Sequence, residues 1–550
     1  MEDRRQDGKT DSGLQAIGER GGSGSSGPPL SAPRSHGAAA DREQLLTLII
    51  VLVCVKLLIH LVAAGVTPYE FHRDEFLYFS MGTHLRLFHM DFPPMMALVS
   101  ELLRHTVGVS VFTYRVLPAI VGTALFALAL GIVRALGGGR VALVVTAIGL
   151  LSGPLFLRAA VLFQPVVLDQ LWWTAALYAL LRLEQTDDPR WWWALGLAGG
   201  LGLLTKFSIF FIGFGVLVAL LLTPRRRALL GPGPWIALAI ALVVGSPSII
   251  GQISLHFPIL DQMQGLERMQ LARMTWGEYL ANQPLMLGPA ILLALAGAAA
   301  PFADARLRAF RAPAIACVTT FLLLGFLHGK PYYAGPVYPT LVAGGAVWLE
   351  GLARPRLRLA LNWGISALAV AYLAVTFPLG LPVIPPAPMA RYAAGLGVTA
   401  ATQTNRGTQL RLPQDYADML GWREKADAVA MVYGSLSPEE QQRTVLYGAN
   451  YGQAGALDLY GRRLGLPPVV SLAGSFYLFG PGNRPGDVLI LLGVDPEDMK
   501  QSVTCGSLEM PARVTNPWGV DEEQDVPILV CRGPSITLQQ LWAQRGPNWG

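Results

Sequence analysis

Long apolar runs separated by short polar breaks fill the chain between residues 45 and 380. A helix needs about 20 mainly apolar residues to cross the hydrocarbon layer of a membrane. The runs therefore predict eleven membrane-spanning helices, which begin near residues 45, 112, 141, 161, 191, 207, 235, 285, 314, 334 and 359. The two spans between residues 191 and 223 share a short stretch and could instead be one kinked helix.

The two ends of the chain follow other patterns. Residues 1–42 are rich in Gly, Ser, Pro and Arg and lack aromatic residues, which predicts a disordered cytoplasmic tail. Beyond residue 385 the apolar runs shorten to strand length, and helical patterns lie between them. The strands are expected at 444–447, 469–471, 488–492 and 528–530, and the helices at about 414–435, 452–464 and 537–544. We expect a membrane domain at 43–384 and an extracytoplasmic α/β domain at 385–550.

Basic residues indicate how the spans are oriented, because short cytoplasmic loops retain Lys and Arg. With eleven spans and a cytoplasmic N-terminus, five basic clusters fall on the cytoplasmic side. They are Arg134 with Arg140, Arg182 with Arg190, Arg225 to Arg227, Arg306 with Arg308 and Arg311, and Arg354 with Arg356 and Arg358. The loop 67–111 and the C-terminal domain then lie outside.

The composition agrees with a membrane protein. With 52% hydrophobic and 14% charged residues, the chain is too apolar for a soluble or fibrous protein. Its net charge of +5 matches basic cytoplasmic loops and does not indicate nucleic-acid binding. Cys54 and Cys317 lie in apolar runs and are expected to be buried, whereas Cys505 and Cys531 could form a disulfide if the C-terminal domain faces an oxidising compartment.

The first outer loop carries the most unusual polar residues. Asp74 and Glu75 follow the first span among aromatic residues, where partial removal from water favours a carboxylate that acts as a general base. The same residues could instead be an interfacial cluster without a function. Segments 76–89 and 94–107 repeat apolar residues at helical spacing and are expected to lie on the membrane surface as amphipathic helices.

Cations are predicted at the outer ends of other spans. Arg158, Lys206 and Lys330 all fall at the level of Asp74, where they could bind a lipid phosphate or simply extend to water. Asp169 lies inside a span and could pair with Arg158. The chain has no P-loop, GxGxxG, HExxH or CxxC motif, so nucleotide hydrolysis, nicotinamide chemistry and zinc proteolysis have no support.

Several of these strings resemble one enzyme family. The segments 71–78 (FHRDEFLY) and 89–94 (HMDFPP) are similar to the first periplasmic loop of the protein O-mannosyltransferase-like, family 39 glycosyltransferases of the GT-C superfamily, which include the aminoarabinose transferase acting on lipid A. The segments 203–207 (LLTKF) and 329–339 (GKPYYAGPVYP) look like further landmarks of that family. The segments 450–456 (NYGQAGA) and 461–467 (GRRLGLP) resemble the outer domain of its bacterial branch.

The resemblance implies a GT-C fold in the bacterial inner membrane and a function. Such an enzyme moves a sugar, with inversion, from a polyprenyl-phosphate donor to a hydroxyl of a lipid, glycan or protein on the periplasmic side. By position, Asp74 would be the general base and Glu75 would orient it or the acceptor. The donor phosphate would be bound by Lys330, Lys206, Arg158, Tyr332 and Tyr333, and the substrates by His72, Arg73, Tyr78, Asp91, Pro93 and Asp169.

The sequence departs from the family at one position and leaves two alternatives. Aminoarabinose transferases place a Lys just before the Pro of the first loop, where this chain has Asp91 and Phe92, so phosphate binding is expected to fall on Lys330. Asp74, Glu75, Asp91, His84 and His89 could supply ligands to a divalent cation, but their spacing predicts no required metal or other cofactor. A lipid-linked sugar flippase without chemistry, or an inactive scaffold, would be consistent with the same composition.

Overall fold

A computed structural model describes residues 35–497, 499 and 503–548. The chain divides into two compact units, 1–46 and 47–550, and the description below concerns the second. Helix α1 (Ser35–Val66) begins inside the segment expected to be a tail, and the rest of that tail, residues 1–34, lies outside the described residues.

A helix is present at each of the eleven expected spans. These helices are α1, α4 (Val111–Ala135), α5 (Arg140–Ser152), α7 (Pro165–Thr186), α8 (Arg190–Thr205), α9 (Ile209–Leu222), α10 (Gly233–Val244), α14 (Ile291–Ala303), α15 (Arg311–Phe326), α16 (Tyr338–Glu350) and α17 (Pro355–Gly380). The segment 191–223 forms two helices, because Lys206 has an extended backbone that ends α8.

Fewer helices meet the length and apolarity needed to cross a membrane. Among the described residues, five stretches do so, and two bent helix pairs raise the number to seven. The five are Ala40–Val66, Val111–Ala135, Trp276–Ala303, Ala305–Phe326 and Pro355–Gly380. The chain is thus a multi-pass membrane protein by composition, and the count of eleven spans remains a prediction.

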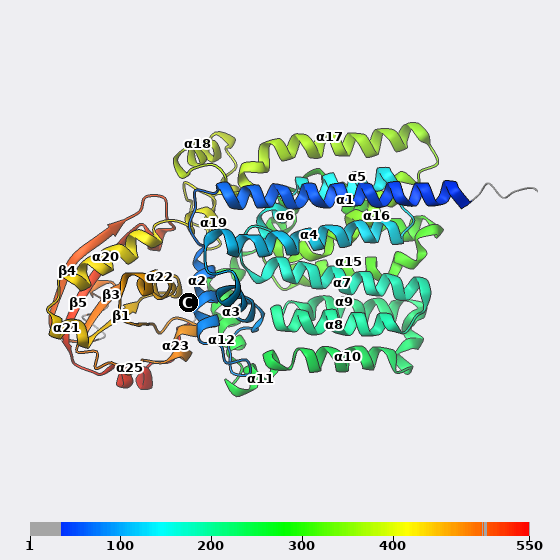
Figure 1. Cartoon of the computed structure of the whole chain (residues 1–550). Helices are drawn as coiled ribbons and strands as arrows, with labels where there is room; N and C mark the ends of the chain where they lie inside the picture. The colour runs from blue at the N-terminus through cyan, green and yellow to red at the C-terminus, as the bar shows by residue number, and fades with distance from the viewer. Residues whose placement is uncertain (1–34, 498, 500–502, 549–550) are drawn as a thin grey trace, which may run out of the picture. The chain divides into compact units, whose positions relative to one another are not determined.

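The basic clusters gather at one end of the helices (Figure 1). Hydrogen bonds join the connections that carry them: Gln185 to the Ala135 carbonyl, Gly139 N–H to Glu350, Arg225 to Glu184, and Arg306 to the Gly351 carbonyl. Helices α8 and α15 start at this end and run away from it. Lys206 and Lys330, which follow them, therefore lie at the opposite end of the helices, as the charge pattern predicts.

Short helices cover that opposite end. They are α2 (Arg73–Thr83), α3 (Met95–Thr106), α6 (Pro154–Ala159), α11 (Ser246–Ser254), α12 (Pro258–Met269) and α13 (Trp276–Leu287). The two amphipathic segments expected at 76–89 and 94–107 correspond to α2 and α3. Helix α2 starts at Arg73 because His72 accepts the N–H of Asp74 at 3.2 Å while Glu75 accepts the N–H of His72 at 2.8 Å, a reciprocal capping arrangement.

The C-terminal part contains a five-stranded sheet. Its strands are β1 (Thr444–Gly448), β2 (Val469–Val470), β3 (Val488–Leu492), β4 (Cys505–Thr515) and β5 (Asp525–Pro534), in the order β2-β1-β3-β5-β4. Strands β2, β1 and β3 are parallel, and β5 runs antiparallel to β3 and β4. Four strands were expected, and β4 was missed because most of its side chains are exposed and polar or small.

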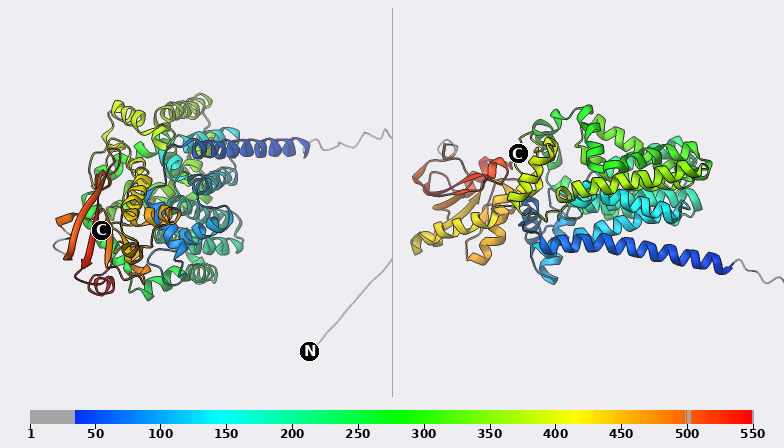
Figure 2. Two further views of the ribbon diagram at one scale, coloured as in Figure 1. Left: turned by 60° about the vertical axis from the view of Figure 1, so that its left-hand side comes forward. Right: turned by 90° about the horizontal axis from the view of Figure 1, so that it is seen from above.

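Helices of the C-terminal part that pack beside the sheet are α20 (Trp422–Gly434), α21 (Pro438–Arg443), α22 (Tyr451–Gly461), α23 (Ser475–Phe479) and α25 (Leu538–Gln544) (Figure 2). Two others, α18 (Pro386–Leu396) and α19 (Gln414–Ala417), contribute to a separate core with Tyr69 and Leu162. The helix expected at 414–435 is split, because Gly421 takes a φ of 82° that only glycine adopts readily.

Helix α2 packs directly on α22. The ring of Phe76 lies 5.5 Å from Trp422 and 5.6 Å from Tyr460, and these residues share one core with the sheet residues Ile490 and Ile528. A Cβ at Gly455 would lie 2.6 Å from the Cβ of Phe76, so this helix contact requires a glycine. The first outer loop and the C-terminal part thus share a core, and the domain boundary expected at 384/385 remains a prediction.

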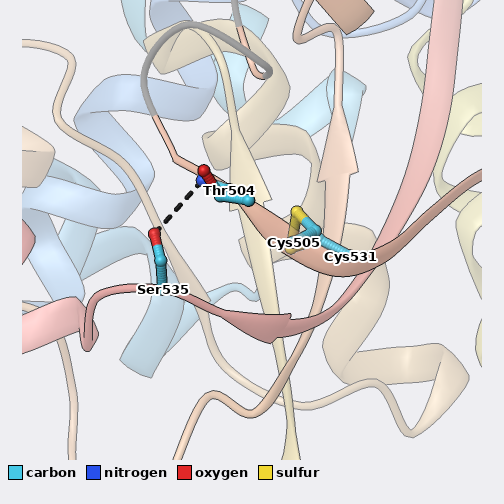
Figure 3. The surroundings of a disulfide bond; sticks show 4 residues. All are labelled: Thr504, Cys505, Cys531 and Ser535. Atoms are coloured by element: carbon cyan, nitrogen blue, oxygen red, sulfur yellow. Dashed lines mark hydrogen bonds between the residues drawn. A yellow bond between two sulfur atoms is a disulfide. The ribbon is translucent and has the colours of Figure 1, made fainter.

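The four cysteines separate into two kinds. Cys505 at the start of β4 and Cys531 in β5 are joined by a disulfide (Figure 3), next to a hydrogen bond from Thr504 N–H to Ser535 Oγ. Cys317 is buried, as expected of an apolar run, whereas Cys54 is exposed on the surface of α1. An apolar run gives no indication of which helix face a residue occupies when the surroundings are lipid.

Candidate active site

A cavity of about 1910 Å³ lies where the short helices meet the C-terminal part. Ten of the expected site residues line it: His72, Arg73, Asp74, Tyr78, Pro93, Arg158, Lys206, Lys330, Tyr332 and Tyr333. Three others, Glu75, Asp91 and Asp169, are absent from its wall. The sequence segments that carry these residues are far apart, so the cavity is assembled by the fold.

Asp74 is held in the cavity wall by two hydrogen bonds to its carboxylate. The hydroxyl of Tyr451 donates to Oδ1 at 2.8 Å, and Gln164 Nε2 donates to Oδ2 at 2.9 Å. The side chain remains 30% exposed. A carboxylate that is fixed in direction and accessible from a cavity is suited to accept a proton from a bound hydroxyl.

Glu75 differs from Asp74 although the two are adjacent. Its side chain is buried, and its two oxygens accept the backbone N–H groups of His72 and Phe163, each at 2.8 Å. The expected role of Glu75, to orient Asp74 or the acceptor, stays a prediction. Glu75 fixes the start of α2 and the turn before Gln164, and so supports the two segments that place Asp74 and its donor.

Lys206 and Lys330 bring two ammonium groups to the cavity. Lys206 Nζ lies 4.8 Å from the ring centroid of Tyr333 and 5.8 Å from that of Tyr332. Burial and the neighbouring Lys206 lower the pKa of Lys330 to about 8, against the opposing effects of Asp74 and Asp415. Among the described residues, neither ammonium has a hydrogen-bond or ion-pair partner. Two adjacent cations with no direct ion-pair partner among the described residues are suited to bind an anion.

Arg158 lies at the same cavity but already has partners. Its Nη1 is 3.1 Å from Asp415 Oδ2, and its Nη2 donates to the Leu379 carbonyl at 2.8 Å. The guanidinium also lies over the ring of Tyr416, 5.6 Å from its centroid. Its charge is therefore partly compensated, and the two lysines are better placed than Arg158 to bind a phosphate.

Asp91 and Asp169 are buried below the surface of the cavity. Both Asp91 oxygens accept the hydroxyl of Ser475 at 2.9 Å, so this residue joins the first outer loop to α23. Asp169 accepts the hydroxyl of Ser208 at 2.7 Å, which ties α7 to the start of α9. Each carboxylate connects two segments in this structure, and the expected substrate contacts of these two residues stay predictions.

An acidic group from the C-terminal part was not expected from the sequence. Asp415 and Asp418 lie with an oxygen 3.9 Å from His72 Nε2, and Arg73 Nη1 lies 3.5 Å from Asp418 Oδ1. Burial raises the pKa of Asp418 to about 6, although Arg73 and His72 oppose the shift. Two aspartates in a short polar segment give no signal of this contact before the fold is known.

Tyr451 was also missed as a site residue, although a signal was present. It lies in the segment 450–456, which resembles the outer domain of the bacterial branch. No group of three or more His, Cys, Asp or Glu side chains among the described residues forms a metal site. The described part of the cavity therefore offers a carboxylate, two open ammonium groups and several hydroxyls.

Much of the cavity wall is apolar. Its apolar residues come mainly from α9, α12 and the end of α15, and include Phe210, Phe211, Leu260, Met263 and Leu327. Leu260 and Leu327 remain 60% and 52% exposed. A cavity whose wall combines exposed apolar residues with a pair of ammonium groups suits an amphiphile with an acidic head group.

Comparisons with known proteins support the resemblance. Residues 91–250 match the family described as dolichyl-phosphate-mannose-protein mannosyltransferase. No protein of curated function matches the chain in sequence.

The fold is similar to that of solved membrane proteins. ArnT from Cupriavidus metallidurans in the apo state has 19% identity and a TM-score of 0.58, and its complex with undecaprenyl phosphate has 16% and 0.56. Each alignment covers 87% of this chain and 97% of ArnT. The archaeal oligosaccharyltransferase AglB from Archaeoglobus fulgidus, in complex with an inhibitory peptide and a dolichol-phosphate, has 12% identity and a TM-score of 0.52, with 84% of this chain and 70% of AglB covered. The expected resemblance is thus supported over residues 91–250, which match the mannosyltransferase family, and in the fold, which the chain shares with ArnT and AglB.

Proposed function

We propose that the chain is a membrane glycosyltransferase that moves a sugar, with inversion, from a polyprenyl-phosphate donor to a hydroxyl acceptor. The observation that carries this proposal is that one cavity holds the accessible carboxylate of Asp74 together with Lys206 and Lys330, neither of which has a hydrogen-bond or ion-pair partner among the described residues. ArnT and AglB, which share the fold, are described in complex with undecaprenyl phosphate and a dolichol-phosphate.

The reaction needs a base and a cationic site for the leaving group. The acceptor oxygen attacks C1 of the sugar from the side opposite the phosphate, while the bond from C1 to the phosphate oxygen breaks. The acceptor proton passes to Asp74, and the electron pair of the broken bond leaves with the polyprenyl phosphate. Lys206 and Lys330 would offset the negative charge that grows on this phosphate.

The apolar wall suits the polyprenyl chain. Exposed residues such as Leu260 and Leu327 would contact the lipid, while its phosphate reaches the lysines. Tyr332 and Tyr333 lie beside Lys206, so they would border the phosphate and the first sugar carbons. On the positive-inside rule we expect this end of the helices on the periplasmic side.

The experiment measures polyprenyl phosphate release from a panel of polyprenyl-phosphate sugars. Membranes carry the wild type, Asp74→Asn, or the control Asp427→Asn, which changes an exposed aspartate of α20. We expect release with at least one donor by the wild type and the control, and a loss of about 100-fold or more in Asp74→Asn because the base is removed. Equal release by Asp74→Asn would contradict the assigned base.

The flippase remains the second candidate and predicts a different result. It would move the labelled donor across the bilayer of sealed vesicles without releasing polyprenyl phosphate. Movement of intact donor by the wild type and by Asp74→Asn alike, with no release in the presence of acceptors, would favour that function. Two uncompensated lysines would serve a flippase equally well, but the accessible carboxylate with two donors would have no use in it.

A further inference from the structure

Tyr451 brings the C-terminal part of the chain into contact with the candidate base. It is the first residue of α22 and lies 377 positions after Asp74, yet its hydroxyl is 2.8 Å from Asp74 Oδ1. The remaining oxygen of this carboxylate accepts Gln164 Nε2. None of the roles proposed above explains why a tyrosine from the sheet-containing part should reach this carboxylate.

Several contacts fix the position of Tyr451. The guanidinium of Arg73 lies over its ring, 5.0 Å from the centroid, and Arg73 is held by Glu522 at 2.6 Å. The preceding residue, Asn450, caps α22 and donates to Glu523 Oε1 at 2.7 Å. Contacts from the first outer loop and from the segment before β5 thus fix the position of the tyrosine.

Glu523 restricts movement at the start of α22. Its side chain is 1% exposed, and its Oε2 lies 2.9 Å from Lys425 Nζ, which is also fully buried. Gln453, two residues after Tyr451, donates to the same carboxylate at 3.2 Å. A buried ion pair with additional hydrogen bonds is costly to rearrange, so the start of α22 has little freedom to move.

In this contact Tyr451 is the hydrogen-bond donor and Asp74 the acceptor. Burial and the adjacent Asp74 raise the pKa of the Tyr451 hydroxyl well above its ordinary value, so the group stays protonated. A carboxylate can only accept hydrogen bonds, so Tyr451 must donate. A hydrogen bond to a carboxylate favours its charged form and fixes its direction. The lone pairs that Tyr451 and Gln164 leave free are then available to the acceptor.

On the basis of the proposed function, we propose that Tyr451 is a positioning residue for the base Asp74. Its O–H holds the carboxylate in one direction, aimed at the acceptor, so that the C-terminal α/β part completes the active site. The base would then be assembled from α2 and α22, which also share the core around Phe76 and Trp422.

The test compares Tyr451→Phe with Tyr460→Phe in the full-length protein. Tyr460 lies on the same helix, and its hydroxyl is 3.4 Å from Glu70 Oε2, away from the cavity wall. We expect Tyr451→Phe to lower kcat about tenfold near neutral pH, because a charge-assisted hydrogen bond is lost. Its KM for the donor should stay unchanged. The acid limb of its kcat profile should move to higher pH, and Tyr460→Phe should match the wild type.

A second variant tests whether a loss of activity in Tyr451→Phe is caused by misfolding. Incorporation of 3-fluorotyrosine at position 451 keeps the ring and strengthens the hydroxyl as a donor, so the acid limb should move to lower pH. Values for Tyr451→Phe and the fluorotyrosine protein that equal those of Tyr460→Phe would overturn the positioning role. Movement of intact donor by the wild type without release of polyprenyl phosphate would instead overturn the proposed function, so the two failures are distinguishable.

Discussion

Single charged residues at the cavity differ mainly in their partners. Arg73 and Arg158 form ion pairs with acidic side chains from the C-terminal part, whereas Lys206 lies over the rings of Tyr332 and Tyr333, and neither Lys206 nor Lys330 has an ion-pair partner among the described residues. An arginine that is already paired can hold the protein together but has less capacity to bind a ligand. The uncompensated lysines are therefore the residues at which a change should affect donor binding most directly.

Lys330 should make donor binding depend on pH. Its pKa is lowered to about 8, so the ammonium is charged below that pH and loses its charge as the pH rises through it. We expect kcat/KM for the donor to fall between about pH 7 and pH 9 in the wild type, because kcat/KM reports the free enzyme. Lys330→Met should lower kcat/KM about tenfold at pH 7 and flatten this part of the profile.

Lys330→Arg supplies the matched control, since arginine stays charged throughout this range. Its kcat/KM should not fall between pH 7 and pH 9, whatever its absolute value. A fall of the same size in Lys330→Arg would show that another group titrates. Donor concentration series at each pH separate KM from kcat.

Adjacent residues show the limit of prediction at this scale. Asp74 and Glu75 have similar chemistry, and the sequence identifies the pair but not which member faces the cavity. Successive residues of a helix point about 100° apart, so only one of the two can share a given face. The structure makes Asp74 accessible and uses Glu75 as a cap. The contact with Tyr451 depends on packing between distant segments, for which no local pattern exists.

At the scale of elements, the pattern of apolar residues predicted the positions of the helices and of most strands. A helix lies at each expected span, and four of the five strands coincide with short apolar runs. Strand β4 was not predicted, because it borders only β5 and most of its side chains face solvent. An edge strand of this kind needs few apolar residues, so its sequence resembles a loop.

The disulfide should stabilise this exposed edge. Cys505 and Cys531 are 26 residues apart and join β4 to β5, so the bond limits the freedom of the unfolded segment between them. Loop entropy predicts that Cys505→Ala with Cys531→Ala lowers the free energy of unfolding by about 3 kcal/mol. Thermal unfolding of the full-length protein, with and without reductant, measures the effect.

Controls for the disulfide come from the other two cysteines. Cys54→Ala with Cys317→Ala leaves the disulfide in place, so unfolding of that variant should still depend on reductant. Unfolding of the variant with alanine at positions 505 and 531 should not depend on reductant. A wild-type protein with four titratable thiols under non-reducing conditions would contradict the pairing.

On the scale of the whole molecule, two patterns that are independent in the sequence coincide in space. Basic residues gather at one end of the helices, and the candidate catalytic groups gather at the other, beneath the C-terminal part. The helix ends that face away from the basic loops therefore carry the chemistry. The sequence could predict this separation because charge along the chain and the parity of the spans are enough to derive it.

The orientation of the whole molecule can be tested with single cysteines in intact bacterial cells. Cys54 and Cys317 are first replaced by Ala, while Cys505 and Cys531 remain paired. A cysteine at Ala228, beside the basic residues after α9, should react with a membrane-impermeant maleimide only after permeabilisation. A cysteine at Ser435, exposed after α20, should react in intact cells, because the C-terminal part is expected on the outer side.

The same labelling also tests the parity of the spans. If α8 and α9 were one span, ten spans and a cytoplasmic N-terminus would place Ala228 and Asp74 outside but Ser435 inside, and the cavity that Asp74 shares with Tyr451 contradicts this arrangement. Reaction of Ala228→Cys alone in intact cells would invert the molecule and place Asp74 on the cytoplasmic side. That result would contradict transfer to a periplasmic acceptor, because the base, the lysines and Tyr451 share one cavity and cannot be placed on different sides of the membrane.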